Sequence, residues 1–371
     1  MEFKTYKFGE ITANFDKKRI PLSSAQREKR QGAYRYYGAQ GVIDYIDDYI
    51  FDGTYLLIAE DGENLKSKKQ NIAQIATGQF WVNNHAHIVQ GNELCDTRFL
   101  CYLINSMDLS GYITGSAQPK LSQASLNAVD VTIPEIAVQR KIVNYLYALD
   151  QKIETNSRIN DNLQQQAMGL FDRYYEQASD TVPFTSVIQI LGGGTPKTGN
   201  LLFWNGDIPF FTPKDVGAPY TLTTEKTITE DGLNHCNSRL YPVNTVFVTA
   251  RGTVGKVGMP GVPMAMNQSC YALVGKEIDQ LMVYFYTLHT VQALKHKASG
   301  AVFDAITTRD FETETIQLIE DDTAAEFLSI ARPMFGQILS NSIENQRLAA
   351  LRDALLPRLM SGEIDVSDIN I

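Results

Sequence analysis

The sequence predicts an α+β protein with two mixed α/β globular units, two long antiparallel coiled-coil helices that separate them, and an internal pseudo-twofold duplication. Three observations predict this fold class. A heptad seam runs through the middle of the chain, the same seam returns near the C-terminus, and the second copy follows the first at a constant spacing, so that Asn156 and Asn160 recur as Asn341 and Asn345. Alternating steps of three and four residues place the seam along one side of a helix that packs against another helix.

Each seam contains two asparagines, and polar residues in such a seam lower stability but fix register and partner orientation. In an antiparallel pair the asparagines would meet near the middle, where each amide can satisfy another. We therefore expect Asn156, Asn160, Asn341 and Asn345 to set the register of the two helices. The first seam is Ile142, Leu146, Leu149, Ile153, Asn156, Asn160, Leu163, Ala167 and Leu170, and the second is Phe327, Ala331, Met334, Ile338, Asn341, Asn345, Leu348 and Leu355.

Two residues predict where each long helix begins. The Asp150 carboxylate can accept the free first-turn N–H groups of a helix, and Pro333 is tolerated in a first turn but not in a helix interior. We therefore expect breaks near 148–150 and near 332–333. Each long helix would then have about 25 residues and a length of about 38 Å. That length is close to one turn of B-DNA, about 34 Å.

The duplication divides the chain into four segments: 1–132, 133–178, 179–318 and 319–371. The first and third are the globular units, and the second and fourth are the helical regions.

The repeat extends upstream of the helices, where its spacing drifts as short insertions in loops would cause. Residues 83–84 correspond to 267–268 and residues 58–62 to 248–252. The apolar runs predict strands at 55–59 and 86–89 and a helix at 97–107, which recur as strands at 246–250 and 270–274 and a helix near 281–294.

Composition bounds the protein class. The chain has 371 residues, 44% of them hydrophobic, which is enough for two or three domains. It has no apolar run of about 20 residues, and residues 1–10 lack the apolar core of a signal peptide. The four cysteines form no CxxC pair, so we expect reduced thiols and a cytoplasmic location.

The net charge of −9 argues against a simple nucleic-acid binder. However, residues 319–371 carry nine acidic and four basic side chains, which is more than half of the excess. The two globular segments are therefore near neutral, and each can still present a basic face to DNA.

By composition, the strongest DNA-binding candidate is the stretch 17–37. Its basic side chains face only Glu28 and the adjacent Asp16, and tyrosines interleave at its end. Lysine and arginine neutralise phosphates, and arginine can pair bidentately with guanine. The alternative is an ordinary solvated loop. The candidate residues are Lys17, Lys18, Arg19, Arg27, Lys29, Arg30, Arg35, Tyr36 and Tyr37.

The glycine-rich loop 192–199 is a second candidate. It looks superficially like a phosphate-binding loop, but such a loop needs glycine immediately before its lysine, and here Pro196 precedes Lys197. We therefore reject nucleotide binding and expect a DNA-facing loop whose Thr195 and Lys197 reach the backbone; a tight turn is compatible with that role. Further candidates, each of a type that is often only a surface residue, are Lys214, Arg251, Gln118 and Lys120.

The sequence predicts no catalytic residue and no metal site. His85 and His87 alternate on an expected strand and would share one face, but a catalytic zinc needs a third ligand. We therefore expect packed or surface imidazoles. Asn83 and Asn84 can read adenine as amides do, although we expect turn residues. The chain has no Asn-Pro dipeptide, which amino-methyltransferase motifs contain, and no Gly-x-Ser-x-Gly elbow.

Taken in order on this duplicated frame, several stretches resemble the specificity (S) subunits of type I restriction–modification systems, the HsdS family, over essentially the full length. Residues 193–196 (GGTP), 203–210 (FWNGDIPF) and 212–215 (TPKD) look like the opening of a target-recognition domain, and 37–41 (YGAQG), 46–49 (IDDY) and 60–62 (EDG) like another subtype. Residues 133–134 (IP) with 139–143 (QRKIV) are similar to the start of the family's first central helix, and 355–364 (LLPRLMSGEI) to the end of its last.

The resemblance implies a subunit without catalytic chemistry of its own. Segments 1–132 and 179–318 would be target-recognition domains, each reading half of a bipartite DNA target. The helices would set the spacing and dock two modification (methyltransferase) subunits, which bind S-adenosylmethionine and methylate adenine; this chain would bind no cofactor directly. Restriction subunits can join such a complex. Residues 322–327 lack the Gln-Arg-Lys-Ile of the first copy, which leaves the exact symmetry of partner docking open.

Two other function classes stay open at this point. One is an enzyme acting alone, as a nuclease or methyltransferase, and the missing motifs count against it. The other is a coiled-coil adaptor whose end domains bind protein rather than DNA, and the net charge of −9 gives it weight. The adaptor predicts no salt-dependent DNA binding, whereas a DNA-recognition subunit predicts an affinity that falls steeply with salt.

Overall fold

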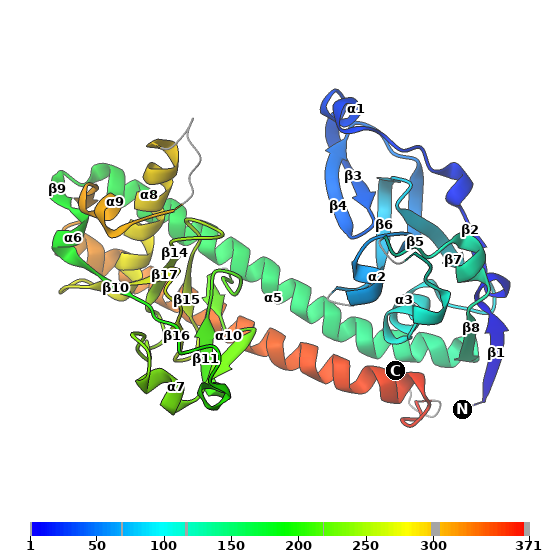
Figure 1. The fold of residues 1–371 in the computed structure, drawn as a ribbon. Helices are drawn as coiled ribbons and strands as arrows, with labels where there is room; N and C mark the ends of the chain where they lie inside the picture. The colour runs from blue at the N-terminus through cyan, green and yellow to red at the C-terminus, as the bar shows by residue number, and fades with distance from the viewer. Residues whose placement is uncertain (1, 68–69, 116–117, 218, 298–304, 367–371) are drawn as a thin grey trace. The chain divides into compact units, whose positions relative to one another are not determined.

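The computed structural model describes residues 2–67, 70–115, 118–217, 219–297 and 305–366 (Figure 1). The chain forms two compact units. Unit 1 consists of Met1–Lys152 with Leu348–Ile371, and unit 2 is Ile153–Arg347. Each unit is mixed α/β and includes a part of both long helices. No helix in the described residues is long and apolar enough to cross a membrane.

Unit 1 is built on a six-stranded sheet and a separate two-stranded ladder. Its strands are β1 (Phe3–Lys7), β2 (Thr12–Asn14), β3 (Gln31–Gly38), β4 (Gly41–Ile46), β5 (Phe51–Ala59), β6 (Ala73–Val82), β7 (Ala86–Gly91) and β8 (Asp130–Pro134), and its short helices are α1 (Ser24–Glu28), α2 (Asn64–Ser67), α3 (Thr97–Ser106) and α4 (Gln123–Asn127). The sheet order is β2-β7-β5-β6-β3-β4, and β1 pairs with β8. Helix α3 buries its apolar side against β5, β6 and β7. The Asp96 carboxylate caps this helix by accepting its first free N–H groups.

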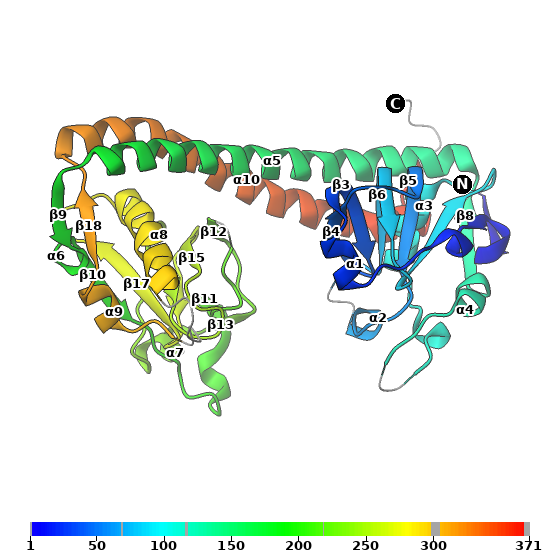
Figure 2. The same cartoon turned by 90° about the horizontal axis from the view of Figure 1, so that it is seen from above.

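Unit 2 repeats this arrangement with a sheet in the order β10-β17-β14-β15-β12, a second sheet β13-β11-β16 and the ladder β18-β9. The strands are β9 (Asp180–Pro183), β10 (Ile188–Gly192), β11 (Trp204–Phe211), β12 (Tyr220–Thr221), β13 (Lys226–Ile228), β14 (Val246–Thr249), β15 (Val257–Pro260), β16 (Ala265–Met266), β17 (Cys270–Gly275) and β18 (Thr315–Leu318). The short helices are α6 (Phe184–Val187), α7 (Glu230–Asn234), α8 (Gln280–Lys297) and α9 (Thr308–Glu312). Helix α8 covers one face of the first sheet (Figure 2). The strands and helices predicted at 55–59, 86–89, 97–107, 246–250, 270–274 and 281–294 are thereby confirmed.

The two units share one strand register. In unit 1, Leu56 of β5 stands opposite Val89 of β7, and in unit 2 Val246 of β14 stands opposite Leu273 of β17. Residues 56 and 246 are separated by the same number of residues as 58 and 248, which correspond to each other in the sequence repeat. Residues 89 and 273 are likewise separated by the same number of residues as the corresponding residues 83 and 267. These strand pairs therefore follow the correspondence seen in the sequence, and the duplication is present in the hydrogen-bonding pattern as well.

The pairings of β3 in unit 1 and β11 in unit 2 repeat in the same way, each with one parallel and one antiparallel neighbour. Tyr36 of β3 pairs with Trp81 of β6 and with Asp44 of β4. In unit 2, Phe210 of β11 pairs with Ala265 of β16 and with Lys226 of β13. The turn that follows is held alike, because the Asn83 N–H donates to the Tyr37 carbonyl at 3.0 Å and the Asn267 N–H donates to the Phe211 carbonyl at 2.9 Å.

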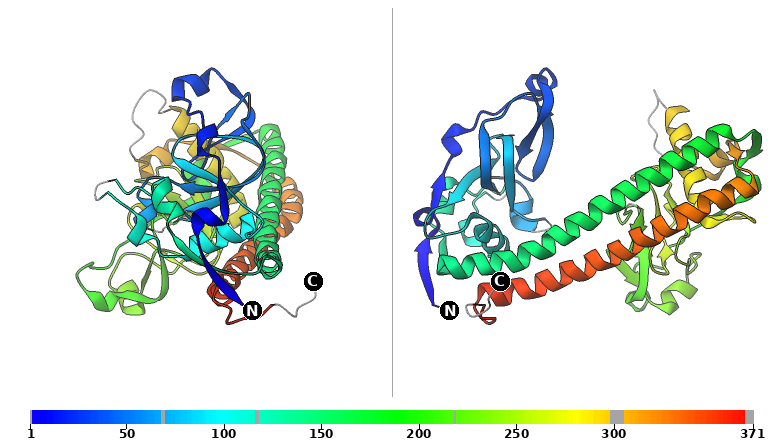
Figure 3. Two further views of the ribbon diagram at one scale, coloured as in Figure 1. Left: turned by 90° about the vertical axis from the view of Figure 1, so that its right-hand side faces the viewer. Right: turned by 180° about the vertical axis from the view of Figure 1, so that it is seen from behind.

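The two long helices are α5 (Ile136–Gln177), with 42 residues, and α10 (Asp321–Met360), with 40. They run side by side within each unit (Figure 3). The expected breaks near 148–150 and 332–333, and the shorter helices that those breaks imply, are wrong. Asp150 caps no helix: its carboxylate accepts hydrogen bonds from the Tyr102 hydroxyl and, at 2.8 Å, from Arg352. Pro333 lies on the exposed side of α10, where water can satisfy the Ser329 carbonyl that loses its helical donor.

Within unit 2, the seam asparagines meet in two pairs. The Asn341 amide donates to the Asn160 side-chain oxygen at 2.8 Å, and the Asn156 amide donates to the Asn345 side-chain oxygen at 2.9 Å. The Asn156 amide also donates to the Glu344 carboxylate at 2.7 Å. The partner number falls as the residue number rises, so the helices are antiparallel here. That these amides set the register remains a prediction.

Candidate nucleic-acid interface

A groove in unit 2 gathers cationic and amide side chains at the ends of its strands. Its volume is about 490 Å³. It lies among the turn after β11, the turn after β14 and the turn between β16 and β17, to which β13 adds one wall. The lining residues of this unit 2 groove are Thr212, Pro213, Lys214, Glu225, Lys226, Arg251, Gly252, Thr253, Asn267 and Ser269.

Hydrogen bonds tie the groove's turns to one another. The Asp215 carboxylate accepts from the Thr212 N–H and hydroxyl at 2.8 and 2.6 Å, and from the Glu225 N–H at 2.8 Å. The Thr253 hydroxyl donates to the Pro213 carbonyl at 2.9 Å. The side chains that line the groove therefore project from a backbone that is already fixed, which a binding site needs in order to recognise a shape.

The glycine-rich loop lies against the turn between β16 and β17. A Cβ on Gly193 would stand 2.0 Å from the Asn267 carbonyl oxygen, so only glycine permits this approach. The Thr195 hydroxyl hydrogen-bonds the side chain of Gln268, which lies between two groove residues. Thr195 therefore stands beside the groove, and Lys197 further along the loop is exposed. Their contact with a DNA backbone remains a prediction.

The cations of the unit 2 groove keep their charges available to a ligand. The Lys214 side chain is 81% exposed, and its ammonium group lies 4.0 Å from the Glu225 carboxylate. The Lys226 ammonium group stands 5.7 Å from the centre of the Trp204 ring. Arg251 is exposed and forms no ion pair with any described residue. Three cations against one carboxylate make this groove attractive to an anionic ligand.

Two positions of unit 1 that match cations of the unit 2 groove carry carboxylates instead. The shared strand register places Asp61 at the position of Arg251, Asp44 at the position of Lys226, and Asn83 at the position of Asn267. Asp61 lies 2.7 Å from His85, and Asp44 accepts a hydrogen bond from Arg27 at 2.9 Å. Hydrogen bonds from Arg27 and Gln31 hold the pKa of the Asp44 carboxyl below its usual value.

In the predicted basic stretch 17–37, some candidate residues bond or pack within unit 1 and the others are exposed. Its arginines are held by unit 1 itself: Arg19 by Glu60 at 2.9 Å, Arg27 by Asp44, Arg30 by Asp47 at 2.8 Å, and Arg35 by the Thr77 carbonyl at 3.0 Å. Tyr36 and Tyr37 belong to the hydrophobic core. The remaining candidates in the stretch are exposed: Lys17, Lys18 and Lys29. Lys18 also stands 5.3 Å from the centre of the Phe15 ring.

Unit 1 also contains a buried ion pair, formed by His87 and Asp16. His87 Nδ1 lies 2.6 Å from the Asp16 carboxylate, and its Nε2 lies 2.8 Å from the Leu121 carbonyl. Burial alone would lower the pKa of His87, but these two hydrogen bonds outweigh it and raise that pKa. Burial opposes the charge on Asp16, yet hydrogen bonds from His87 and the Ile88 N–H hold the pKa of the carboxyl below its usual value.

The other expected residues are placed as follows. The expectation that His85 and His87 share one face of a strand is wrong, because His85 sits in the turn before β7 and is exposed. Asn83 and Asn84 lie in the same turn. Gln118 is exposed, and Lys120 lies 3.3 Å from the Glu60 carboxylate. In the described part of the chain, no group of three or more His, Cys, Asp or Glu side chains can hold a metal ion.

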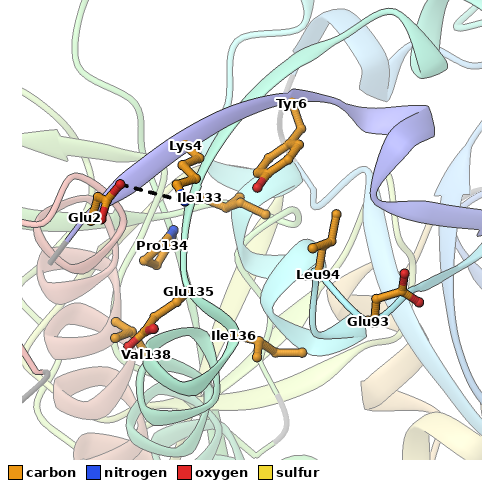
Figure 4. Close-up of a pocket in the computed structure, with 10 residues that line it drawn as sticks. All are labelled: Glu2, Lys4, Tyr6, Glu93, Leu94, Ile133, Pro134, Glu135, Ile136 and Val138. Carbon is orange, nitrogen blue, oxygen red and sulfur yellow. Dashed lines mark ion pairs between the residues drawn. The ribbon is translucent and has the colours of Figure 1, made fainter.

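A separate cavity of about 480 Å³ in unit 1 does not suit DNA. It lies where β1 meets the start of α5 and is drawn in Figure 4. Glu2, Glu93 and Glu135 line it together with a single cation, Lys4, which pairs with Glu2 at 3.8 Å. Its remaining walls are largely apolar, so the cavity repels phosphate and favours a protein or apolar ligand.

Sequence reasoning missed four residues that lie in or beside the unit 2 groove. Lys226 had no motif to mark it, because its place depends on the pairing of β13 with β11. Asn267 and Gln268 are the counterparts of Asn83 and Asn84 in the duplication, so the repeat alone could have nominated them. Asp215 acts through the backbone of neighbouring turns, which the sequence does not reveal.

Comparisons with known proteins agree with one another. The family described as "Type I restriction modification DNA specificity domain" matches residues 1–165 and 178–331. The HindI specificity subunit of Haemophilus influenzae, a type I restriction enzyme subunit, is 24% identical over 88% of this chain and 87% of that protein. A specificity-subunit candidate of the same organism, S.HindORF215P, is 28% identical over 64% of this chain, and the match spans 63% of that protein's length.

A solved structure shows the same fold. The S subunit of a type I restriction–modification system from M. genitalium superposes with a TM-score of 0.64 at 11% identity, covering 96% of each chain. The two family matches fall on the two repeated halves, which agrees with the duplicated strand register. The chain therefore belongs to the family of type I restriction–modification DNA specificity proteins.

Proposed function

We propose that this chain is the DNA sequence-recognition subunit of a type I restriction–modification complex, and that each unit reads one half of a bipartite target. It is a non-catalytic subunit rather than an enzyme. The observation that carries the DNA role is the unit 2 groove, whose lining includes Lys214, Lys226 and Arg251 together with the amide residue Asn267. Cations hold phosphates and so set position, while amides and guanidinium groups read base edges.

The two long helices supply the second part of the proposal. As an antiparallel coiled coil they would set the spacing between the two half-sites, with Asn156, Asn160, Asn341 and Asn345 fixing the register. The pseudo-twofold duplication would offer two related docking sites to two modification subunits. Those subunits would carry S-adenosylmethionine and transfer its methyl group, and a restriction subunit would join where the system has one. The complex would act on chromosomal DNA in the cytoplasm.

A coiled-coil protein adaptor is the competing function. The cavity of Figure 4, lined by carboxylates and apolar side chains, is the specific observation that favours protein binding in unit 1. The cationic groove of unit 2 favours DNA. The salt dependence of DNA binding distinguishes the adaptor from the DNA-recognition subunit. Phosphate contacts make the logarithm of DNA affinity fall linearly with the logarithm of salt concentration.

A methylation map of genomic DNA tests the proposal. The map compares cells that carry the modification subunit with and without this chain. We expect a split motif, two short specific halves around an unspecified spacer, that vanishes when the chain is absent. A motif that persists without the chain, or no motif in either case, contradicts the recognition role. Binding of the chain to the modification subunit without any methylated motif would then favour the adaptor.

A further inference from the structure

We infer that Arg251 reads a guanine through the major groove and thereby fixes one base of the half-target bound by unit 2. This inference rests on the proposed function and adds to it a residue and a base. It comes from the geometry of the unit 2 groove and from the matched position in unit 1, where an aspartate stands.

Backbone hydrogen bonds fix the position of Arg251 at the unit 2 groove. It is the second residue after β14; the Ala250 N–H donates to the Ser269 carbonyl at 2.8 Å, and the Arg251 N–H lies 3.3 Å from the same oxygen. Gly252 then has φ +81, a left-handed conformation that turns the chain sharply away. Arg251 therefore stands at the start of the connection between β14 and β15, where the hydrogen bonds to Ser269 fix its backbone.

The chemistry of the side chain distinguishes Arg251 from its neighbours. A planar guanidinium group presents paired donors that match the O6 and N7 acceptors of guanine, whereas an ammonium group is a point charge suited to phosphate. Lys214 is 81% exposed beside Glu225, and Lys226 packs over Trp204, so both suit the backbone of a duplex. Arg251 makes no ion pair within the described residues and is therefore available to a base.

The matched residue of unit 1 predicts a reversed base preference there. Asp61 stands at the position of Arg251, and its carboxylate is held by His85 at 2.7 Å. A carboxylate accepts hydrogen bonds only, so at this position it suits the exocyclic amine of cytosine rather than the two acceptors of guanine. Exchanging the charge at position 251 should therefore change the base that is read, and not only the affinity.

The test is a methylation map of cells that carry the modification subunit with wild-type chain, Arg251→Ala, Arg251→Asp or, as a phosphate-type control, Lys214→Ala. For Arg251→Ala we expect the same split motif with one guanine of one half made degenerate, its preference reduced roughly 5- to 150-fold. Arg251→Asp should shift that position toward cytosine. Lys214→Ala should lower methylation overall and leave the motif unchanged.

A second measurement uses only the wild-type chain, so it does not depend on the folding of any variant. Wild-type complex is assayed on the mapped target and on the same target with 7-deazaguanine at each guanine in turn, which removes the N7 acceptor. A loss at one guanine supports the inference. Equal methylation of all substituted targets, or an unchanged motif with Arg251→Ala, overturns it while the recognition role stands. If wild-type chain directs no split motif at all, the proposed function itself fails.

Discussion

The two units place opposite charges on one strand framework. Unit 2 has Arg251 and Lys226 where unit 1 has Asp61 and Asp44, although the strands that carry them pair in the same register. These charged side chains lie outside the hydrophobic core. A duplicated fold can keep its packing while its exposed loops diverge, because loops tolerate changes that buried strands do not. The comparison implies that the two units present two different surfaces to a ligand.

Removing the two lysines of the unit 2 groove should have the largest effect on the difference between the units. With Lys214→Gln and Lys226→Gln together, we expect DNA affinity of the complex to fall roughly 10- to 100-fold, since two charged phosphate contacts are lost. The slope of log affinity against log salt should decrease by about 1.8. Fluorescence anisotropy titrations at several salt concentrations measure both quantities. Lys4→Gln, on an exposed strand of unit 1, is the control; an equal effect there would show that only net charge matters.

The helix seams differ between the units in the same sense. The part of the seam in unit 1 is apolar, with Ile142 and Leu146 buried, whereas unit 2 buries the pair Asn160 and Asn341. Asn341→Leu alone should cost about 1–3 kcal/mol, because it leaves the Asn160 amide buried without that partner. Adding Asn160→Leu should recover most of the loss. Urea unfolding of the wild type, the two single variants Asn341→Leu and Asn160→Leu, and the double variant gives the coupling energy between the two side chains. Strictly additive losses of stability would contradict the pairing.

The starts of the two long helices provide a third difference. Gln139 is fully buried, and its side chain accepts from the Asp96 N–H at 2.9 Å and donates to the Leu94 and Pro134 carbonyls at 2.9 and 2.8 Å. In unit 2 the duplication places Ala324 there, beside a cavity of about 220 Å³. Gln139→Ala should destabilise unit 1 by about 1–3 kcal/mol.

Hydrogen exchange resolved by peptide measures this effect in each unit. Protection should fall in unit 1 and stay unchanged in unit 2. Gln166→Ala, an exposed glutamine on the same helix, is the matched control. If both substitutions reduce protection equally, the buried hydrogen bonds of Gln139 contribute nothing special to the start of the helix.

A smaller difference concerns pH. The ion pair of His87 and Asp16 belongs to unit 1, and the matched residues of unit 2 are Tyr271 and Gly192. The pKa of His87 is raised above its usual 6.5, so its contribution to stability is full below pH 6.5 and is lost as pH rises through the raised value. The pKa of Asp16 is lowered below 3.8, so its contribution is present above pH 3.8 and is lost as pH falls through the lowered value.

Unfolding measured as a function of pH checks the signs. Unit 1 should lose stability on both the acidic and the alkaline sides of this window, and His87→Gln should remove the alkaline loss. Unit 2, followed by hydrogen exchange in the same samples, should show no matching change. A His87→Gln variant that retains the wild-type pH dependence would contradict the role of the pair.

The sequence pattern predicted the elements that repeat and missed those that depend on contacts between distant residues. Apolar runs and heptad steps located β5, β7, β14 and β17 and the seam, because these features are local. The helix break expected at Asp150 fails because Tyr102 and Arg352, far away in the chain, bond that carboxylate. The physical cause of both results is the same: periodicity is local, whereas the partner of a polar group is not.

The candidate site shows the same division. Composition marked the arginines of residues 17–37, but the acids that engage them come from other strands, as Asp44 does for Arg27. In contrast, Arg251 was a lesser candidate that directly follows the strand predicted at 246–250, and it lines the unit 2 groove. Strand ends were therefore a better guide to the unit 2 groove than the density of positive charge.

The most direct test of this account is a methylation map that alters one unit at a time. Cells with the modification subunit receive wild-type chain, a unit 2 variant (Arg251→Ala) or a unit 1 variant (Asp61→Ala). We expect each variant to change specificity in one half of the split motif, a different half for each, and to leave the other half and the spacer length intact. Variants that alter both halves together, or the same half, would contradict the claim that the two units read DNA separately.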